Sequence, residues 1–264
     1  MLACGAFGAD EPRKDEDAGA DAPSASADAG AALDADGSSP ATTCASNPSA
    51  LFCDDFEQPG RTIPPLASAT AQPWDVWQSI GSQVASLSAG GTSPNAFWVA
   101  GAMVNGDRSR FVRSLDIRGK RIRWTFEMNV KKLVQQFAGL TSRLGFATFS
   151  FEGDKSIRFV LSKNADGVTL DGAAIHNLGA STVTAAFTRP AVPAALGTWE
   201  PFTIEFEPLS GVDRFTVYVR DVVLLTLPLD PPGPGAISIG ADLSNTENLS
   251  SCEVGFDNVV VTTF

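Results

Sequence analysis

The stretch Leu51-Phe52-Cys53-Asp54-Asp55-Phe56-Glu57 decides the fold of this 264-residue chain. Few large apolar side chains precede it, whereas the residues after it form a series of runs rich in Val, Ile, Phe, Thr and Trp. Gly, Pro, Asn and Asp separate these runs, and that spacing is typical of an antiparallel β-sandwich or barrel. We therefore predict a single all-β domain over residues 44–264, with this stretch as its first strand.

Alternation of apolar and polar side chains is clearest over Arg121–Val130. Successive side chains of a strand point to opposite faces, so alternate residues of this run share a face. The apolar face is predicted to carry Ile122, Trp124, Phe126, Met128 and Val130. In Arg143–Glu152 the same rule predicts one face with Leu144, Phe146, Thr148 and Ser150, opposite Gly145, Ala147, Phe149 and Phe151.

Turn residues predict two hairpins. Asp166-Gly167, a frequent hairpin turn, joins strands over 156–162 and 167–170, and Arg220-Asp221 joins strands over 213–220 and 222–227. Four prolines predict a loop over 228–234, because proline cannot donate to a sheet ladder. Residues 177–195 are the longest predicted excursion. With the remaining runs, including a last strand over 256–264, we expect one sandwich of roughly 12–15 strands.

The N-terminal segment has a different composition. Residues 5–43 are mainly Ala, Asp, Gly, Ser and Pro, so they bury too little apolar surface to offset their ordering entropy, and we predict a disordered tether. Immediately before it, Leu2-Ala3-Cys4 resembles the lipobox of bacterial lipoproteins, in which the Cys is lipidated. The resemblance implies an exported protein that a lipid on Cys4 anchors to an envelope membrane, the outer membrane or the cell surface. The leader is then expected upstream of Met1.

Charge is unevenly distributed. The formal net charge is −11, and residues 1–50 carry nine acids and two bases, so the folded part is only mildly acidic. This balance gives no support to nucleic-acid binding. A basic run could bind an anionic glycan or a lipid headgroup, although alternation divides its members between faces and loops where neighbouring acids can pair with them. Its members are Arg108, Arg110, Arg113, Arg118, Lys120, Arg121 and Arg123.

Apart from Cys4, three cysteines are available for pairing. Cys44 and Cys53 are nine residues apart and could close a short loop that joins the tether to the first strand. Such a bridge would contribute about 2.5–3 kcal/mol in the loop-entropy model. The alternative joins Cys53 to Cys252 and thus the first strand to the last strand. An exported compartment permits either pairing.

Four motifs follow one another in a recognisable order: Phe52-Cys53-Asp54-Asp55-Phe56-Glu57, Ser93-Pro94-Asn95-Ala96-Phe97, Trp199–Ile204 with Phe215–Val219, and Gly255-Phe256-Asp257-Asn258-Val259-Val260-Val261. This order resembles the concanavalin A-like lectin/glucanase superfamily, which includes laminin-G-like modules. The resemblance implies a jelly-roll sandwich of two curved antiparallel sheets. It also implies that the first and last strands are neighbours in one sheet.

The same resemblance implies a structural calcium ion beside the first and last strands. Ca²⁺ takes six to eight oxygen ligands, often from carboxylates and loop carbonyls. We predict Asp55, Glu57 and Asp257 as ligands, in a region that also supplies Asp54 and Asn258. The alternative is that these side chains are hydrogen-bonded without a metal.

Relatives that hydrolyse glucans use a Glu-x-Asp-x-(x)-Glu strand, which this chain lacks. Its nearest counterpart puts Glu205 and Glu207 on one face, about 7 Å apart along the strand. Retaining glycosidases hold their carboxyl groups about 5–5.5 Å apart. These two are the candidate catalytic residues, with two charges on a polar face as the alternative. His176 is the single histidine and has no predicted partner, so a zinc site is poorly supplied.

Three functions are consistent with these features. The first is non-catalytic, surface-tethered binding of carbohydrate, either a polysaccharide or a glycoconjugate. The second is hydrolysis of a glycan through Glu205 and Glu207. The third is a structural role in which the sandwich contacts another envelope protein. An exposed Trp or Tyr beside polar groups on an open face would favour sugar binding, because aromatic rings stack on sugar rings.

Overall fold

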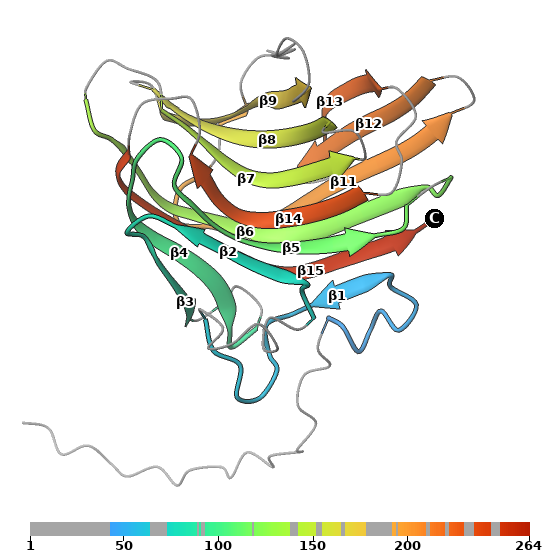
Figure 1. Ribbon diagram of the computed structural model, residues 1–264, viewed down its shortest axis with the longest axis horizontal. Coiled ribbons are helices and arrows are strands. Elements are labelled where there is room, and N and C mark those ends of the chain that lie inside the picture. The colour runs from blue at the N-terminus through green and yellow to red at the C-terminus, as the bar shows by residue number, and fades with distance from the viewer. Residues whose placement is uncertain are drawn as a thin grey trace, which may run out of the picture. The chain divides into compact units, whose positions relative to one another are not determined.

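The computed structural model describes residues 43–63, 73–88, 90, 93–117, 119–137, 142–151, 155–164, 167–177, 192–193, 195–209, 212–219, 222–229, 235–243 and 249–264. Within these segments there are fifteen strands and no helix. The strands form two antiparallel sheets, A and B, that pack face to face as a jelly-roll sandwich (Figure 1). The predicted all-β fold class is confirmed.

Sheet A contains both ends of the domain. Its described strands pair in the order β13-β12-β11-β6-β15-β4-β3, and β1 also pairs with β15. Their bounds are β1 Phe52–Asp54, β3 Val84–Ser88, β4 Ala96–Met103, β6 Ile122–Gln135, β11 Trp199–Leu209, β12 Val212–Val219, β13 Val222–Leu229 and β15 Leu249–Thr263.

Sheet B lies against sheet A. Its described strands pair in the order β10-β9-β8-β7-β14-β5-β2. Their bounds are β2 Val76–Ile80, β5 Arg108–Leu115, β7 Ser142–Phe151, β8 Lys155–Asn164, β9 Gly167–Asn177, β10 Val192–Pro193 and β14 Gly235–Leu243. The two predicted hairpins are β8–β9 and β12–β13.

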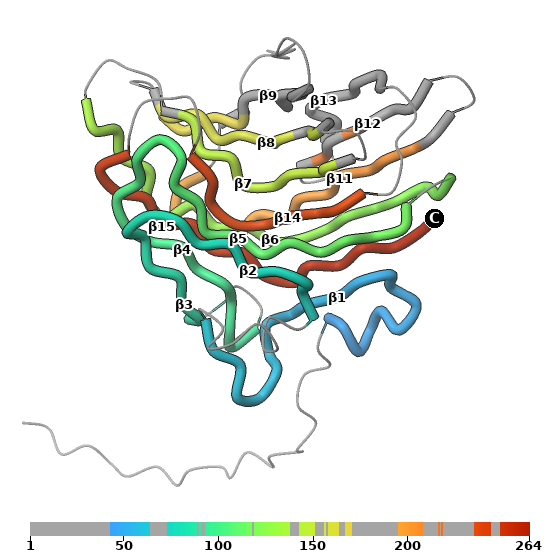
Figure 2. The backbone as a smooth tube through the Cα atoms, viewed as in Figure 1, coloured from blue at the N-terminus to red at the C-terminus, as the bar shows by residue number. Residues whose placement is uncertain are grey.

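The first and last strands are neighbours, as the sequence predicts. Phe52 pairs with Val261, and Asp54 pairs with Val259. Figure 2 shows the blue segment of β1 beside the red segment of β15. On its other sides β15 pairs with β6 and β4, so the end of the chain lies inside sheet A rather than at its edge.

The predicted apolar face of β6 forms the centre of the core. Its five alternate residues, from Ile122 to Val130, are at most 3% exposed. Phe126 stacks on Phe202 of β11 with ring centroids 5.5 Å apart, and it contacts Phe146 of sheet B at 6.3 Å. Full burial of one such side chain stabilises the fold by about 1.5–3 kcal/mol, so this row of residues holds the two sheets together.

The predicted faces of β7 are wrong because the strand contains a register shift. Its pairing with β8 and β14 shifts between Gly145 and Ala147. A β-bulge adds one residue to a strand and reverses the alternation beyond it. Phe146 and Ala147 are therefore both buried in the core, whereas Thr148 pairs with Arg158 on the outer side.

The opening stretch forms a shorter strand than predicted. β1 ends at Asp54, whose Oδ1 accepts a hydrogen bond from the Phe56 amide at 2.9 Å. An Asp side chain that bonds the backbone two residues on makes an Asx turn. Phe56 has a φ of 58°, in the left-handed region, and its side chain is fully buried. The stretch thus contributes to the core after leaving the sheet.

Edge strands account for the other differences from the prediction. β2 and β3 are five-residue edge strands that the sequence analysis does not find. Pro228 pairs with Arg214 inside β13 rather than lying in the predicted loop. β13 is the edge of sheet A, where the missing N–H of a proline needs no partner.

The chain divides into two compact units, Met1–Ser39 and Pro40–Phe264. Cys4, the predicted tether up to residue 42, Arg118 and residues 178–191 of the predicted excursion lie outside the described residues. In the part of the chain that is described, no helix is both long and apolar enough to span a membrane.

Candidate functional site

The outer face of sheet B carries polar side chains in register across its strands. One row is Val76, Val112, Ser238, Thr148 and Arg158. A second row is Ile80, Arg108, Asp242, Gly145 and Val160. Gln78, Arg110 and Gly240 lie between them. A two-residue spacing along β2, β5, β8 and β14 places all three rows on the same face. In β7 the bulge between Gly145 and Ala147 brings Gly145 and Thr148 to that face although they are three residues apart.

Four of these side chains form one hydrogen-bonded network, the arginine cluster: Gln78, Arg110, Asp242 and Arg158. Arg110 Nε donates to Gln78 Oε1 at 2.8 Å, and Arg110 Nη1 donates to Asp242 Oδ2 at 3.1 Å. Arg158 Nη2 donates to the same Asp242 oxygen at 3.4 Å. The four residues come from β2, β5, β14 and β8, so the cluster exists only when sheet B is assembled.

Two glycines of this face allow neighbouring residues to approach closely. A Cβ at Gly145 would lie 2.7 Å from Cδ of Arg158, so the missing side chain lets Arg158 extend across β7 toward Asp242. Gly240 has a φ of +140°, and a Cβ there would lie 2.6 Å from Cα of Arg110. A larger residue at Gly145 would displace the Arg158 side chain, and one at Gly240 would clash with the backbone of β5.

The polar residues at the centre of this face are less exposed than the apolar residues at its β2 edge. Asp242, Thr148 and Ser238 are 8%, 6% and 5% exposed, whereas Val76 and Ile80 are 46% and 52% exposed. Buried polar groups need hydrogen-bond partners. The centre of the face is therefore polar and largely covered, whereas its β2 edge is apolar and exposed.

Positive charge predominates around Arg110. Burial lowers the pKa of Arg110, and the nearby Arg158 and Arg108 lower it further against the opposing effect of Asp242. Arg143 is exposed on β7, two residues before Gly145 on the same face. Among the described side chains, this face therefore holds four arginines, Arg108, Arg110, Arg143 and Arg158, and one carboxylate, although the whole chain has a net charge of −11. We call it the arginine-bearing face.

The described tryptophans lie elsewhere. Trp98 and Trp199 contact each other on the outer side of sheet A with ring centroids 5.4 Å apart. Trp98 is only 3% exposed, and Lys131 Nζ lies 3.9 Å from its ring centroid. The other three pack in or against the core: Trp74, Trp77 and Trp124. The predicted signature of an exposed ring beside polar groups is therefore not found among the described residues of the arginine-bearing face.

Glu205 and Glu207 share one face of β11, as predicted, but that face belongs to the outer side of sheet A. Glu205 Oε1 lies 2.5 Å from Nη2 of Arg123, and Glu207 Oε1 lies 3.1 Å from Nη2 of Arg121. Each carboxylate is thus held in an ion pair. This arrangement agrees with the alternative of paired charges on a polar face.

The basic run is divided between the two sheets. Arg108 and Arg110 lie on the outer face of sheet B, whereas Arg121 and Arg123 lie on the outer side of sheet A, over the Phe264 ring. Arg113 pairs with Asp75 at 2.6 Å. Of the members of the run that the structure describes, Arg108 and Arg110 contribute to the arginine-bearing face.

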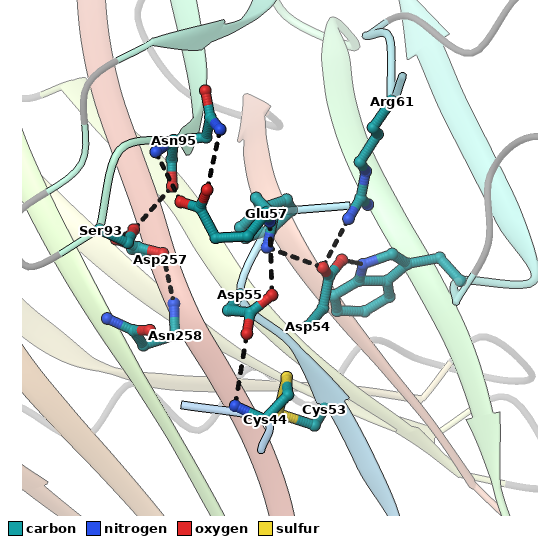
Figure 3. Close-up of polar contacts among 12 residues, drawn as sticks. Cys44, Cys53, Asp54, Asp55, Glu57, Arg61, Ser93, Asn95, Asp257 and Asn258 are labelled. Carbon is teal, nitrogen blue, oxygen red and sulfur yellow. Dashed lines mark hydrogen bonds and ion pairs between the residues drawn. A yellow bond between two sulfur atoms is a disulfide. The ribbon is translucent and has the colours of Figure 1, made fainter. Parts of the chain in front are cut away.

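The acids predicted as calcium ligands lie where β1 meets β15 (Figure 3). Asp55 accepts hydrogen bonds from the amides of Cys44 and Glu57, both at 3.3 Å. The Glu57 carboxylate accepts two from Asn95, at 2.7 and 3.0 Å. The Asp257 carboxylate accepts one from Ser93 Oγ at 2.5 Å and one from the Asn258 amide at 2.8 Å.

Glu57 and Asp257 fit a cation better than Asp55 does. Burial, together with the negative charges of Glu127 and Glu57, raises the pKa of Asp257 to about 7. A cation would offset this accumulation of negative charge. Gly90 approaches so closely that a Cβ there would lie 2.5 Å from Asp257 Oδ2.

Asp55 is directed toward Cys44 instead (Figure 3). Among the described residues no three His, Cys, Asp or Glu side chains form a group that could hold a metal ion. The calcium site therefore stays a prediction. In it Glu57 and Asp257 are the carboxylate ligands, and backbone or amide oxygens must supply the remaining oxygen ligands.

Of the two predicted disulfides, the structure contains Cys44–Cys53, with Cα atoms 5.5 Å apart. Cys252 is a free, buried thiol. The disulfide joins the start of the domain to β1. Next to it, Thr43 Oγ1 donates a hydrogen bond to Asn258 of β15 at 2.5 Å. His176 pairs through its backbone with Ser156 in the β8–β9 ladder, and its side chain lies outside the described ones.

Gln78, Arg158 and Asp242 are not identified by the sequence analysis. The available signal is a charged residue on the polar side of otherwise apolar strands, as at Arg158 within 156–162. That signal does not tell which strands are neighbours, and the pairing of β14 with both β5 and β7 is what brings the three residues together.

Comparison with known proteins supports the fold. No protein-family model matches this sequence, and no curated protein matches it. Among solved structures, the endo-β-1,4-glucuronan lyase from the fungus Trichoderma reesei is 13% identical with a TM-score of 0.51, over 73% of this chain and 92% of the lyase. The cellulose-induced protein Cip1 is 12% identical with a TM-score of 0.53, over 80% and 96%.

The PL7 alginate lyase AlyA1 from the marine Zobellia galactanivorans is also similar. It is 14% identical with a TM-score of 0.51, over 74% of this chain and 96% of the lyase. At these identities the likeness is one of fold. That fold is an antiparallel jelly-roll sandwich, the architecture that the order of sequence motifs implies.

Proposed function

We propose that this protein binds a polysaccharide or glycoconjugate on the outer face of sheet B and does not cleave it. The arginine cluster is the observation that carries this proposal. Planar amide, guanidinium and carboxylate groups hold fixed donor and acceptor directions, which suits them to a chain of sugar hydroxyls. Two of the proteins with a similar fold are named as polysaccharide lyases, which is consistent with a glycan ligand.

Binding without cleavage is favoured by the position of the predicted acid pair. Glu205 and Glu207 are on the opposite sheet from the arginine cluster, and both are paired with arginine. On the arginine-bearing face Asp242 is itself held between Arg110 and Arg158. A general acid or base must be free to exchange a proton with its substrate, and these ion pairs oppose such exchange.

A polysaccharide panel tests the proposal. The migration of the full chain in affinity gels should be slowed by at least one polysaccharide of the panel. Gln78→Ala removes the amide that holds Arg110, and binding should weaken severalfold. Gln135→Ala is the matched control, because Gln135 donates to the Lys163 carbonyl from β6 of sheet A. Equal loss in both variants, or no binding to any polysaccharide, would contradict the proposal.

The alternative functions have their own readouts in the same panel. New reducing ends, or an unsaturated sugar detected by ultraviolet absorbance, would show cleavage and replace binding by catalysis. Recovery of one stoichiometric protein partner with no glycan would instead support the structural role. Either result would overturn non-catalytic binding as the function.

The proposed cellular setting is an exported protein anchored by lipid at Cys4. It is supported by the Leu2-Ala3-Cys4 motif and by the acidic composition that follows it. In the native host the protein should partition into detergent, and Cys4→Ala should release it to the soluble fraction, because stable anchoring takes more than one acyl chain or an equivalent second signal. A wild-type protein with a free thiol at Cys4 would end this part of the proposal.

A further inference from the structure

We infer that the ligand of the arginine-bearing face is an acidic polysaccharide, whose carboxylate or sulfate groups bind at Arg110 and Arg158 with Asp242 as the internal counter-ion. This inference rests on the proposed function and names the chemical class of its ligand.

The charge of this face favours an anionic ligand. Arg108, Arg110, Arg143 and Arg158 lie on this face with Asp242 as the one described carboxylate. An arginine in a protein is always protonated. Arginines still outnumber the acids of this face when Asp171, which pairs with Val160 in the row of Asp242, is added to Asp242. An anionic ligand would neutralise this excess of positive charge.

The guanidinium groups of Arg110 and Arg158 converge at the centre of the face. Arg110 and Arg158 start from β5 and β8, which are separated by β14 and β7, and both reach the same oxygen of Asp242. Strand spacing places their backbones about 14 Å apart. The two guanidinium groups thus converge on one point at the centre of the face. Each has five N–H donors, so an arginine held by Asp242 can donate to a bound anion as well.

Both arginine side chains are largely buried before any ligand binds. The side chains of Arg110 and Arg158 are 18% and 19% exposed. Arg110 is further held by Gln78, so its orientation is set before a ligand arrives. A guanidinium that is already ordered and partly desolvated binds carboxylate or sulfate more strongly than a mobile surface arginine, because less ordering entropy is lost.

The composition of the face disfavours nucleic acid as the polyanion. Proteins that bind single strands stack bases on exposed aromatic rings, and the described residues of this face offer none. The apolar residues at its β2 side, Val76 and Ile80, suit contact with the C–H faces of sugar rings. A polysaccharide with acidic groups matches both features.

The closing experiment compares polymers that differ in charge alone. The full chain is titrated by calorimetry with a polyglucuronate, with the same polymer after reduction of its carboxyl groups to hydroxyls, with a sulfated dextran and with unmodified dextran. We expect binding to the charged member of each pair to be at least about tenfold tighter, because charged hydrogen bonds are the stronger ones. The preferred member of the two charged polymers identifies carboxylate or sulfate as the ligand group.

Variants locate the effect on this face. Arg110→Gln and Arg158→Gln should each weaken polyanion binding about 10- to 100-fold. Asp242→Asn should keep or strengthen it, because a competing negative charge is removed. Arg123→Gln is the matched control, since Arg123 is paired with Glu205 on the outer side of sheet A, and it should leave affinity unchanged. For wild-type protein, affinity should fall as NaCl rises from about 0.05 to 0.5 M.

The outcomes separate the two proposals. Equal affinity for the charged and neutral polymers, with no salt dependence, would overturn the acidic ligand and leave glycan binding intact. No binding to any of the four would count against glycan binding itself. Single-stranded DNA bound as tightly as polyglucuronate, or equal loss in Arg123→Gln, would overturn the inference of a specific site on this face.

Discussion

Phe52 in the first strand is paired with Val261 in the last strand, and both side chains are buried. β15 in turn separates β6 from β4, so the centre of sheet A depends on a strand that is made last. The domain can therefore close only when the end of the chain is present.

Truncation before Cys252 should abolish folding. It removes Val254, Phe256, Val259 and Val261, each with no exposed surface. One buried Phe alone is worth about 3–5 kcal/mol, against a total stability of about 5–15 kcal/mol. Deletion of residues 5–39, which precede the unit Pro40–Phe264, should leave the melting midpoint nearly unchanged. Circular-dichroism melts of both proteins check this, and a cooperative transition without residues 252–264 would contradict it.

The buried ion pair between Asp54 and Arg61 should be important for stability. Their side chains are 0% and 3% exposed, and Trp74 Nε1 also donates to Asp54. Asp54→Ala should lower the free energy of unfolding by about 3–5 kcal/mol, because it leaves a guanidinium buried without its partner. Asp75→Ala is the comparison, because Asp75 and Arg113 are 35% and 32% exposed.

Loss of an exposed pair of this kind changes the free energy of unfolding by about 0–1 kcal/mol. Urea unfolding at neutral pH measures both variants. Similar losses for Asp54→Ala and Asp75→Ala would show that burial does not set the strength of these pairs.

Cys252 should not react with thiol reagents in the native protein. Burial raises the pKa of Cys252 to about 12, with a further contribution from Glu253. At pH 8 the thiolate fraction is then on the order of 10⁻⁴, and the thiolate is the reactive form. In a Cys4→Ser background the native protein should give no thiol signal, and denaturant should expose one.

The same shift affects stability at high pH. In the unfolded chain the thiol ionises near its ordinary pKa of 9.0, whereas the native thiol resists ionisation up to about 12. Its contribution to stability is therefore fully present below pH 9 and declines as the pH rises from 9 toward 12. Cys252→Ser should weaken that decline, and an identical high-pH profile in the two proteins would argue against the shift.

Calcium should raise the melting midpoint if the predicted ion binds. An ion that binds only the native state stabilises it in proportion to the logarithm of its concentration. Millimolar Ca²⁺ should raise the midpoint of the wild type and a chelator should reverse this, and Asp257→Asn should remove the effect. Asp55→Asn should keep the calcium effect, because Asp55 is bonded to the Cys44 and Glu57 amides. An equal melting midpoint with calcium and with chelator would contradict the calcium site. The acids where β1 meets β15 would then be held by hydrogen bonds alone.

The fold was predictable because its signals are local. The alternation from Ile122 to Val130 is set by consecutive residues, and burial of that face follows directly. The exchange of faces in β7 could not be predicted, because the bulge between Gly145 and Ala147 depends on pairing with both neighbouring strands. Edge strands such as β2 also give weak signals, because one side of each strand lacks a partner.

The candidate site was less predictable because its residues are distant in sequence. Arg110 and Asp242 are brought together by the pairing of β5 with β14, and no local pattern specifies that pairing. The basic run around Arg110 reads as one feature in the sequence, yet Arg123 lies on the other sheet. The acids of the first and last strands lie in one region because these two strands are paired, and the order of motifs implies that pairing.

Hydrogen exchange with and without a bound polysaccharide tests the central claim most directly. Ligand on the outer face of sheet B should slow amide exchange in peptides from β5, β7, β8 and β14, which carry the arginine-bearing face. Peptides from β11 and the start of β6, which carry Glu205 and Arg123, should exchange at the same rate in both states. Protection confined to β11 and β6 would place the ligand on the outer side of sheet A and contradict the account.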